Sequence, residues 1–305
     1  MRVWRLIRSG HLSAAMNMAI DEAIMHSVAQ GAQPALRLYG WAPPAISIGY
    51  FQNAEKEVDF AACKSVGVDV VRRPTGGRAV LHDVEVTYSL AIPEENPIVP
   101  KGITESYRKI SEGMVLGLRK LGLDAEVVAT PRARGAARSV APEGAPSQAS
   151  ASLTQRIPSP ARGALSGACF DAPSWYEVTA GGKKIVGSAQ VRRMGVLLQH
   201  GSILLDLDAA KLFTCLRFSS DEERRRAMEQ FLEKATSVWA ALGRPVSFME
   251  TSEAVLWGLS EALGVEFREG ELTPAEKKMA ERLAETKYSR LDWKSAGGSE
   301  GTQTA

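Results

Sequence analysis

The stretch RRPTGGRAVLHD, residues 72–83, stands directly after a β-branched run that predicts a strand. Arg73 offers hydrogen-bond donors for an anion, and Gly76 and Gly77 let the backbone approach a ligand or adopt a positive φ angle. His82 adds a polar group at the end of the stretch. A pocket-lining loop and a surface turn with solvated arginines are equally good interpretations of this composition. The lysine and hydroxyl residue of a Walker loop do not follow the glycines, so the pattern does not predict a nucleotide P-loop.

Short β-branched or aromatic runs on both sides of this stretch predict a series of strands. They lie at residues 35–41, 45–50, 68–73 and 86–92. Further along the chain, Gly181 and Gly182 separate two strand-like runs and predict a β-hairpin. A second pair of strands, VLLQH (196–200) and SILLDL (202–207), is expected to hinge near Gly201.

Apolar residues at helical spacing predict helices between the strands and at the end of the chain. The predicted helices cover residues 13–29, capped by Ser13, then 107–121 and 220–242. The last of these opens with Ser220 and Glu223, the pattern of a capping box. Two shorter helices are expected to open at Thr251 and Thr273. Strands in the first two-thirds and a helical end predict an α+β domain with a largely mixed or antiparallel sheet.

The composition is that of an ordinary globular chain, with 45% hydrophobic and 24% charged residues over 305 positions. A net charge of +2 gives no field strong enough to make nucleic acid or an anionic membrane the main partner. No signal-peptide pattern opens the chain, and no stretch reaches the roughly 18 apolar residues of a membrane helix. We therefore expect a cytoplasmic protein, monomeric by default, that acts on neither nucleic acid nor membrane.

Residues 130–163 differ in composition from the rest of the chain. They contain five prolines, five arginines and one glutamate among Ala, Ser and Gly. Such a segment buries too little apolar surface to offset its chain entropy, so we expect a disordered surface insertion. The remainder is expected to form one domain over 1–293, with a flexible tail at 294–305.

Three cysteines, Cys63, Cys169 and Cys215, are too few and too scattered for a disulfide framework or a zinc site. A thiolate accepts and releases acyl groups well, so Cys169 suits a two-step acyl transfer between a thioester donor and an amine. The commoner role of a cytosolic cysteine is that of a small buried hydrophobe. That interpretation is favoured for Cys63 and Cys215, which have apolar neighbours.

Lys183 and Lys184 follow the hairpin turn, and successive residues of a strand point to opposite faces. One lysine can therefore be solvated while the other points into a cleft that is lined by Ser188. The plainer alternative is two solvated lysines, because lysine is seldom buried unpaired. His200 can face the same pocket or satisfy a backbone carbonyl. No motif predicts a metal site.

Taken together, these stretches resemble the lipoate-protein ligase and octanoyltransferase family, which shares its catalytic fold with biotin protein ligases. The matching stretches are NMAIDEAI (17–24), ISIGYFQN (46–53), RRPTGGRAVLHD (72–83), VTYSL (86–90) and the run 169–208. The resemblance implies an α+β catalytic domain with mixed sheets flanked by helices. It also implies catalytic roles for Cys169 and Lys184. The substrate-binding residues that we expect are Arg73, Gly76, Gly77, His82, Gly187, Ser188 and His200.

Two departures from the ligase pattern favour the transferase branch of the family. Ligases of this family read RRxSGGGAVxHD, whereas this chain has Arg78 in place of the third glycine. Cys169 occupies the position of the acyl-accepting cysteine of the ligase-like octanoyltransferases, and ligases need no such nucleophile. The resemblance implies that octanoyl-acyl carrier protein is the donor. The acceptor would be glycine-cleavage H protein or another lipoyl domain, and no cofactor is required.

Three alternatives stay open at this point. The chain could be an ATP-dependent lipoate-protein ligase, or an amidotransferase that moves octanoyl between lipoyl-accepting proteins. It could also be a non-catalytic lipoyl- or acyl-binding module on the same fold. The sequence identifies no general base.

Overall fold

An eight-stranded sheet with the order β11-β1-β2-β6-β10-β9-β8-β7 forms the centre of the molecule. The computed structural model describes residues 2–129 and 176–290. The strands of this sheet are β1 (Arg2–Leu12), β2 (Ala35–Trp41), β6 (Glu85–Pro93), β7 (Ala125–Ala129), β8 (Tyr176–Ala180), β9 (Lys183–Arg193), β10 (Val196–Leu204) and β11 (Val265–Glu269). β1 runs parallel to β2 and β11, and every pair from β2 across to β7 is antiparallel. The sheet is therefore mixed, as predicted.

A smaller three-stranded sheet carries the glycine-rich stretch. Its strands are β3 (Ala45–Ile48), β4 (Asp69–Arg72) and β5 (Val80–His82), in the order β4-β3-β5. The short helices near it are α2 (Ala54–Glu57), α3 (Phe60–Ser65), α5 (Ala209–Cys215) and α6 (Asp221–Lys234). Because β4 and β5 both pair with β3, the loop that joins them crosses the end of β3.

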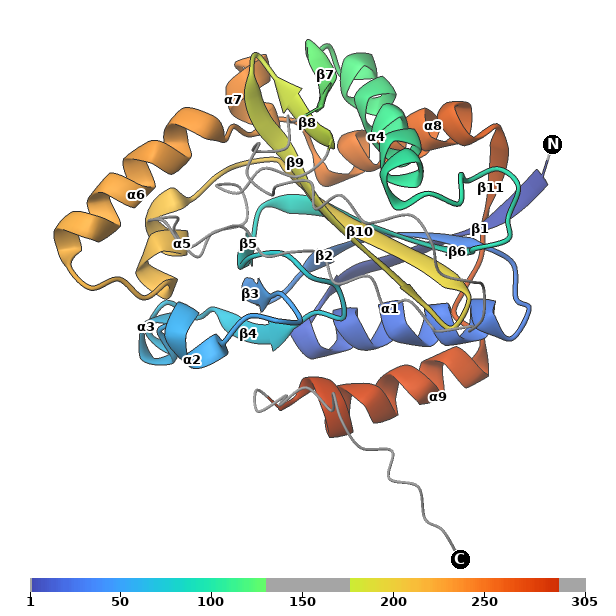
Figure 1. Ribbon diagram of the computed structural model, residues 1–305, viewed down its shortest axis with the longest axis horizontal. Coiled ribbons are helices and arrows are strands. Elements are labelled where there is room, and N and C mark those ends of the chain that lie inside the picture. Colours follow the sequence, from blue (N-terminus) through green and yellow to red (C-terminus); the bar gives the residue numbers. More distant parts are fainter. Residues whose placement is uncertain (1, 130–175, 291–305) are drawn as a thin grey trace, which may run out of the picture.

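Helices cover both faces of the large sheet (Figure 1). On one face lie α4 (Ile103–Lys120) and α8 (Phe248–Leu263), and on the other lies α1 (Ala14–Ala29). Outside α1 pack α9 (Pro274–Leu283) and a π-helical turn (Ala284–Tyr288). The alternation of strand residues creates two cores: Leu36 and Leu38 of β2 pack with the α4 and α8 side chains, whereas Ala35 and Tyr39 pack with α1. In the described ranges, no helix is long and apolar enough to cross a membrane.

Several sequence predictions are confirmed. α1 begins after Ser13, whose side chain accepts from the Met16 N–H. Gly181 and Gly182 both have positive φ angles, of 56° and 75°, as the hairpin between β8 and β9 requires. Thr273 caps α9 with the predicted capping box.

The predicted hinge at Gly201 is wrong. β10 is continuous through Gly201, and the turn that precedes it lies at Met194 and Gly195, which both have positive φ angles. A Cβ atom at Gly201 would lie 2.5 Å from Ser188 Oγ and 2.8 Å from Tyr88 Cε1. Glycine is needed there for close packing of neighbouring strands, not for a change of direction.

The predicted single helix over 220–242 is also wrong. α6 ends at Lys234, Ala235 is extended, and a separate helix α7 (Val238–Leu242) begins after its own cap, Ser237. The extended link forms backbone contacts with β9, since Thr236 N–H donates to Lys184 O at 2.9 Å. A tertiary contact with the sheet therefore interrupts a helical sequence pattern.

Further differences concern helix boundaries and two strands at one side of the large sheet. The Glu223 carboxylate accepts from Ser219 rather than from the Ser220 N–H, so the expected capping box at α6 is incomplete. α8 begins at Phe248 with Ser247 as cap, not at Thr251, and at 16 residues it is longer than α6. Strands β1 and β11 were not predicted. The insertion expected at 130–163 and the tail expected at 294–305 lie outside the described residues.

Three glycines allow α4 and α8 to cross in close contact. A Cβ atom at Gly258 of α8 would lie 2.2 Å from the Gly113 carbonyl oxygen and 2.4 Å from the Gly117 nitrogen, both in α4. These neighbours are backbone atoms, which cannot move aside as the end of a side chain can. The helix pair therefore depends on glycine at this crossing.

We expect Gly258→Ala to lower the free energy of unfolding by about 1–3 kcal/mol, because overpacking outweighs the gain in helix propensity of about 1 kcal/mol. The matched control is Gly270→Ala, where the added Cβ would meet only the Leu6 carbonyl oxygen at 3.9 Å. Its effect should stay within about 0.5 kcal/mol. Urea unfolding measures both, and equal stabilities of the two variants would contradict the close-contact account.

Candidate functional site

A pocket lies where the small sheet meets the α1-facing side of the large sheet. The residues that line it are Met18, Tyr39, Trp41, Ser47, Arg73, Val80, His82, Gly187, Ser188, Ala189, His200, Gly201 and Ser202. Among them are Arg73, His82, Gly187, Ser188 and His200, which the sequence singled out from stretches more than a hundred residues apart. The fold thus brings most of the predicted substrate-binding residues to one place.

Arg73 is buried and determines the shape of the glycine-rich loop. Its guanidinium donates to the carbonyl oxygens of Ser47, Gly76 and Arg78 at 2.6–3.1 Å and to the Ser47 hydroxyl at 3.0 Å. These bonds direct the donors of Arg73 at its own loop. The role of Arg73 as a donor to a substrate anion therefore stays a prediction.

Gly76 and Gly77 form the tip of this loop and are not among the described lining residues of the pocket. Gly77 has a φ angle of 96°, a conformation that strongly favours glycine. A Cβ atom at Gly49 would lie 2.0 Å from the Gly77 carbonyl oxygen, so the loop rests directly on the end of β3. The glycines at the tip were expected to let the backbone approach a ligand or adopt a positive φ angle. The structure shows the positive φ angle at Gly77 and a close approach to the backbone of Gly49.

Asp21 of α1 is a buried carboxylate that links one wall of the pocket to the helix. It accepts from Arg37 Nη1 at 2.8 Å, from the Tyr39 hydroxyl at 2.9 Å and from His200 Nδ1 at 3.2 Å. Burial alone would raise the pKa of Asp21, but the hydrogen bond from His200 and the charge of Arg37 outweigh burial and hold that pKa below its usual value. Asp21 is therefore ionised.

His200 joins Asp21 to the glycine-rich loop. Its Nε2 lies 2.6 Å from Thr75 Oγ1, and burial lowers the pKa of the imidazole. For a neutral ring beside an ionised Asp21, the hydrogen-bond network assigns the proton to Nδ1, so that Nε2 accepts from the Thr75 hydroxyl. His200 thus satisfies side chains rather than the backbone carbonyl that was its alternative partner.

His82 forms a second imidazole–carboxylate pair on the same pocket. Its Nδ1 lies 2.8 Å from Glu85 Oε1, and its Nε2 lies 2.7 Å from Ser47 Oγ. The ring stacks on Trp41 with centroids 4.0 Å apart and an interplanar angle of 12°. All three contacts fix the orientation of the imidazole.

Lys184 is buried and Lys183 is exposed, so the two lysines do point to opposite faces. The Lys184 ammonium lies 3.0 Å from Glu177 Oε1 of the neighbouring strand β8. Lys184 is not among the described lining residues of the pocket. Its catalytic role stays a prediction.

Cys169 lies outside the described residues, so its expected role is not tested by the geometry. Cys63 and Cys215 are buried in the apolar core of the smaller sheet, as expected of small hydrophobes. The hydrogen bond with Cys215 is the main cause that raises the pKa of the Cys63 thiol, which disfavours the thiolate that acyl transfer needs. The same hydrogen bond lowers the pKa of Cys215.

Sequence reasoning missed Asp21, Ser47, Thr75 and Glu85, which hold the two histidines. Asp21 and Glu85 were visible only as acidic residues inside apolar patterns: Asp21 on a buried helix face and Glu85 at the start of a buried strand. A carboxylate buried among apolar residues must have a hydrogen-bond or charge partner. This requirement is the one sequence signal that could have identified Asp21 and Glu85 as site residues.

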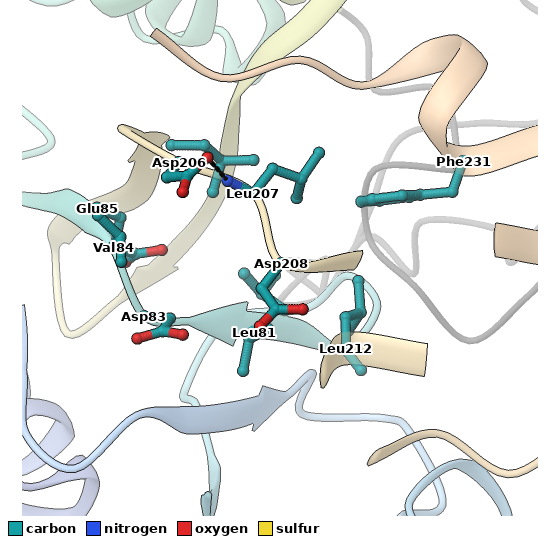
Figure 2. Close-up of a pocket in the computed structure, with 12 residues that line it drawn as sticks. Leu81, Asp83, Val84, Glu85, Asp206, Leu207, Asp208, Leu212 and Phe231 are labelled. Atoms are coloured by element: carbon teal, nitrogen blue, oxygen red, sulfur yellow. Dashed lines mark hydrogen bonds between the residues drawn. The ribbon is translucent and has the colours of Figure 1, made fainter. Parts of the chain in front are cut away.

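A second pocket lies against α5 and α6 (Figure 2). Its apolar part is formed by Leu81, Leu204, Leu207, Leu212 and Phe231, and the carboxylates of Asp83, Asp206 and Asp208 lie around it. Val80 lines both pockets, and Glu85, the partner of His82, lines this one. None of the predicted site residues in the described part of the chain lines this pocket. Within residues 2–129 and 176–290, no group of three or more His, Cys, Asp or Glu side chains could hold a metal ion.

The comparisons with known proteins agree with one another. The family model of the lipoyl protein ligase A/B catalytic domain matches residues 13–260. Octanoyltransferase LipM of Kyrpidia tusciae is 52% identical over 96% of this chain and 98% of its own length, and octanoyltransferase LipM of Bacillus subtilis is 42% identical over 95% and 97%.

Solved structures of lipoate-protein ligases share the fold. The bipartite lipoate protein ligase of Thermoplasma acidophilum, from a structural analysis that includes its E2 lipoyl domain, aligns with a TM-score of 0.74 at 28% identity, over 96% of both chains. Lipoate-protein ligase A bound with ATP aligns with a TM-score of 0.70 at 29% identity, over 96% of this chain and 98% of the other. The chain therefore belongs to the family of lipoyl protein ligase A/B catalytic domains and, within it, to the octanoyltransferases of the LipM type.

Proposed function

We propose that the chain transfers an octanoyl group from octanoyl-acyl carrier protein, through a thioester on Cys169, to a lysine of a lipoyl-accepting protein. The observation that carries the proposal is its similarity to octanoyltransferase LipM, at 52% identity over 96% of the chain. Glycine-cleavage H protein is the acceptor that we favour, and the lipoyl domain named with the archaeal neighbour supports an acceptor of this kind. The reaction is proposed to take place in the cytoplasm with the chain as a monomer.

The transfer needs two substitutions at one carbonyl carbon. The Cys169 thiolate attacks the thioester of the donor, a new C–S bond forms, and the thiol of the carrier protein leaves with a proton. The amine of the acceptor lysine then attacks the acyl-enzyme, a C–N bond forms, and Cys169 is released as a thiol. Because an amide is more stable than a thioester, no ATP is consumed.

The pocket offers a suitable environment for the acyl group. Met18, Val80 and the ring of Trp41 give apolar surface to the chain. We propose that Lys184 lies against the acyl carbonyl and stabilises the negative charge that develops on its oxygen. Its burial supports this role, since an ammonium acts more strongly away from water, and the ion pair with Glu177 holds the side chain in place.

The first test is transfer without ATP. Purified protein, octanoyl-acyl carrier protein and a lipoyl-accepting protein should give an octanoylated acceptor, detected by its intact mass, in the absence of nucleotide. Cys169→Ala should abolish the product because the covalent intermediate cannot form, whereas Cys63→Ala, a cysteine placed in the core, should retain it. Product that appears only when ATP and a free acid are supplied would identify a ligase instead.

The second test compares the two adjacent lysines. Lys184→Met should lower turnover on the order of 10²-fold or more, as expected for the loss of one charge-stabilising donor. Lys183→Met is the matched control, because Lys183 is exposed and its ammonium donates to the Leu232 carbonyl oxygen. Thermal unfolding checks that both variants fold, and similar turnover in the two would remove Lys184 from the mechanism.

A further inference from the structure

We propose that Cys63 and Cys215 form a redox-active thiol pair, which a small hydroperoxide converts to an intramolecular disulfide and a thiol reductant restores. The inference goes beyond the proposed function, since it uses neither the pocket residues nor Cys169. The two cysteines are 152 residues apart in sequence. They nevertheless meet in the core of the smaller sheet, where the sequence predicts only two separate small hydrophobes.

Backbone hydrogen bonds hold the two cysteines next to each other. Cys63 lies in α3, and Cys215 is the last residue of α5. The N–H of Asp59, the N-cap of α3, donates to the Cys215 carbonyl oxygen at 2.9 Å. The two segments continue in an antiparallel bridge between Val58 and Leu216. Main-chain contacts that involve neither thiol therefore fix the relative position of the pair.

The thiols themselves are in contact. The Cys63 Sγ lies 3.8 Å from the Cys215 carbonyl oxygen, and the two thiols form a hydrogen bond with each other. A disulfide requires two Cβ atoms that face each other at short distance. Because the thiols already meet, the sulfur–sulfur bond can form through a shift of two side chains, with the backbone segments left in place.

The two thiols differ in their readiness to ionise. The hydrogen bond from Cys63 lowers the pKa of Cys215, burial opposes this shift, and the charge of Lys211, one helical turn earlier in α5, adds to it. The carboxylates of Asp59 and Asp208 act in the same direction as burial but do not reverse the shift. The hydrogen bond raises the pKa of Cys63. Cys215 is therefore the thiol that attacks the oxidant, and Cys63 is the thiol that resolves the product.

Burial limits which oxidants can reach the pair. Cys63 is 1% exposed and Cys215 is fully buried. Hydrogen peroxide is close to water in size and needs only a local opening of the short helix α5. A larger disulfide such as oxidised glutathione must first be joined to Cys215 in a mixed disulfide, for which a buried thiol leaves little room. We therefore assign a small hydroperoxide as the oxidant.

The proposed reaction consumes two thiols and one peroxide molecule. The Cys215 thiolate attacks one peroxide oxygen, the O–O bond breaks, and the hydroxide that leaves takes up the Cys215 proton to give water. Cys215 is then a sulfenic acid. The Cys63 sulfur attacks the Cys215 sulfur, and hydroxide leaves with the Cys63 proton as a second water. The two sulfurs lose two electrons in total, and the peroxide gains them.

The experiment maps the thiols after exposure to peroxide. Wild-type protein is reduced with dithiothreitol, desalted, treated with hydrogen peroxide, alkylated under denaturing conditions and digested without reductant. We expect two peptides joined through Cys63 and Cys215, lighter by two hydrogen atoms than the separate peptides. Renewed treatment with dithiothreitol should release both thiols. The same cross-link is expected in Cys169→Ala, because Cys169 is not a member of the pair.

The half-exposed Met249 reports within the same digest that the peroxide dose was sufficient. If Met249 is oxidised to the sulfoxide while Cys63 and Cys215 are both still alkylated as thiols, the proposal is overturned. A disulfide that includes Cys169, or a sulfinic acid at Cys215 of wild type without a cross-link, also overturns it. None of these outcomes depends on acyl transfer.

Single-cysteine variants test the order of the two steps. In Cys63→Ala, the sulfenic acid on Cys215 has no resolving thiol, so it should accumulate and be captured by dimedone. In Cys215→Ala, Cys63 should remain a thiol over the same time. Thermal unfolding checks that both variants fold, and the mapping of wild type stays decisive if they do not. Capture at Cys63 but not at Cys215 would contradict the assigned roles.

The cross-link should also change stability. It joins residues that are 152 positions apart, so the Tm of oxidised wild type should rise by about 5–10 °C and return after reduction. Cys63→Ala treated in the same way should show no such rise. An unchanged or lower Tm of cross-linked wild type would contradict the claim that the two segments already have the geometry of the bond.

Discussion

The buried carboxylate of Asp21 is the constraint on which the site depends. A charge removed from water must be compensated by partners with good geometry, and those partners here come from separate parts of the chain. Arg37 and Tyr39 come from β2, and His200 comes from β10. Through Thr75, His200 extends the same network to the glycine-rich loop. One helix residue thus fixes the relative positions of α1, the large sheet and the loop.

The loops at the pocket are shaped by arginines rather than left open for ligand. Arg72 donates to the carbonyl oxygens of Gly49, Tyr50 and Gln52, while Arg73 donates to those of its own loop. A guanidinium has several donors in a fixed plane, so a single buried arginine can orient several carbonyl groups at once. The two arginines that looked like anion ligands in the sequence therefore serve first to fix the backbone around the pocket.

Local patterns predicted local structure well. Caps such as Ser13 and Thr273, the hairpin at Gly181 and the opposite orientations of Lys183 and Lys184 follow from rules that involve neighbouring residues. The resemblance to the family also indicated which segments meet at the pocket. Errors arose where a distant contact decides the outcome. Gly201 is required by the side chains of adjacent strands, and the helix after residue 219 breaks where its end contacts β9. The carboxylate partner of His200 was not predictable for the same reason, because Asp21 and His200 are 179 residues apart in sequence.

The two imidazole–carboxylate pairs also show why residue type alone does not assign a role. His82 and His200 line one pocket and each has a carboxylate and a hydroxyl as partners. They differ in that Asp21, the carboxylate beside His200, also forms an ion pair with Arg37, whereas among residues 2–129 and 176–290 no arginine or lysine forms an ion pair with Glu85. The proposed function requires one covalent intermediate, the octanoyl thioester of Cys169.

The most direct measurement of that intermediate is the intact mass of the protein after mixing with octanoyl-acyl carrier protein alone, followed by peptide mapping. The account predicts one octanoyl adduct, removed by hydroxylamine and located on Cys169. Absence of an adduct, or an adduct on a different residue, would contradict the covalent transfer on which the account is built.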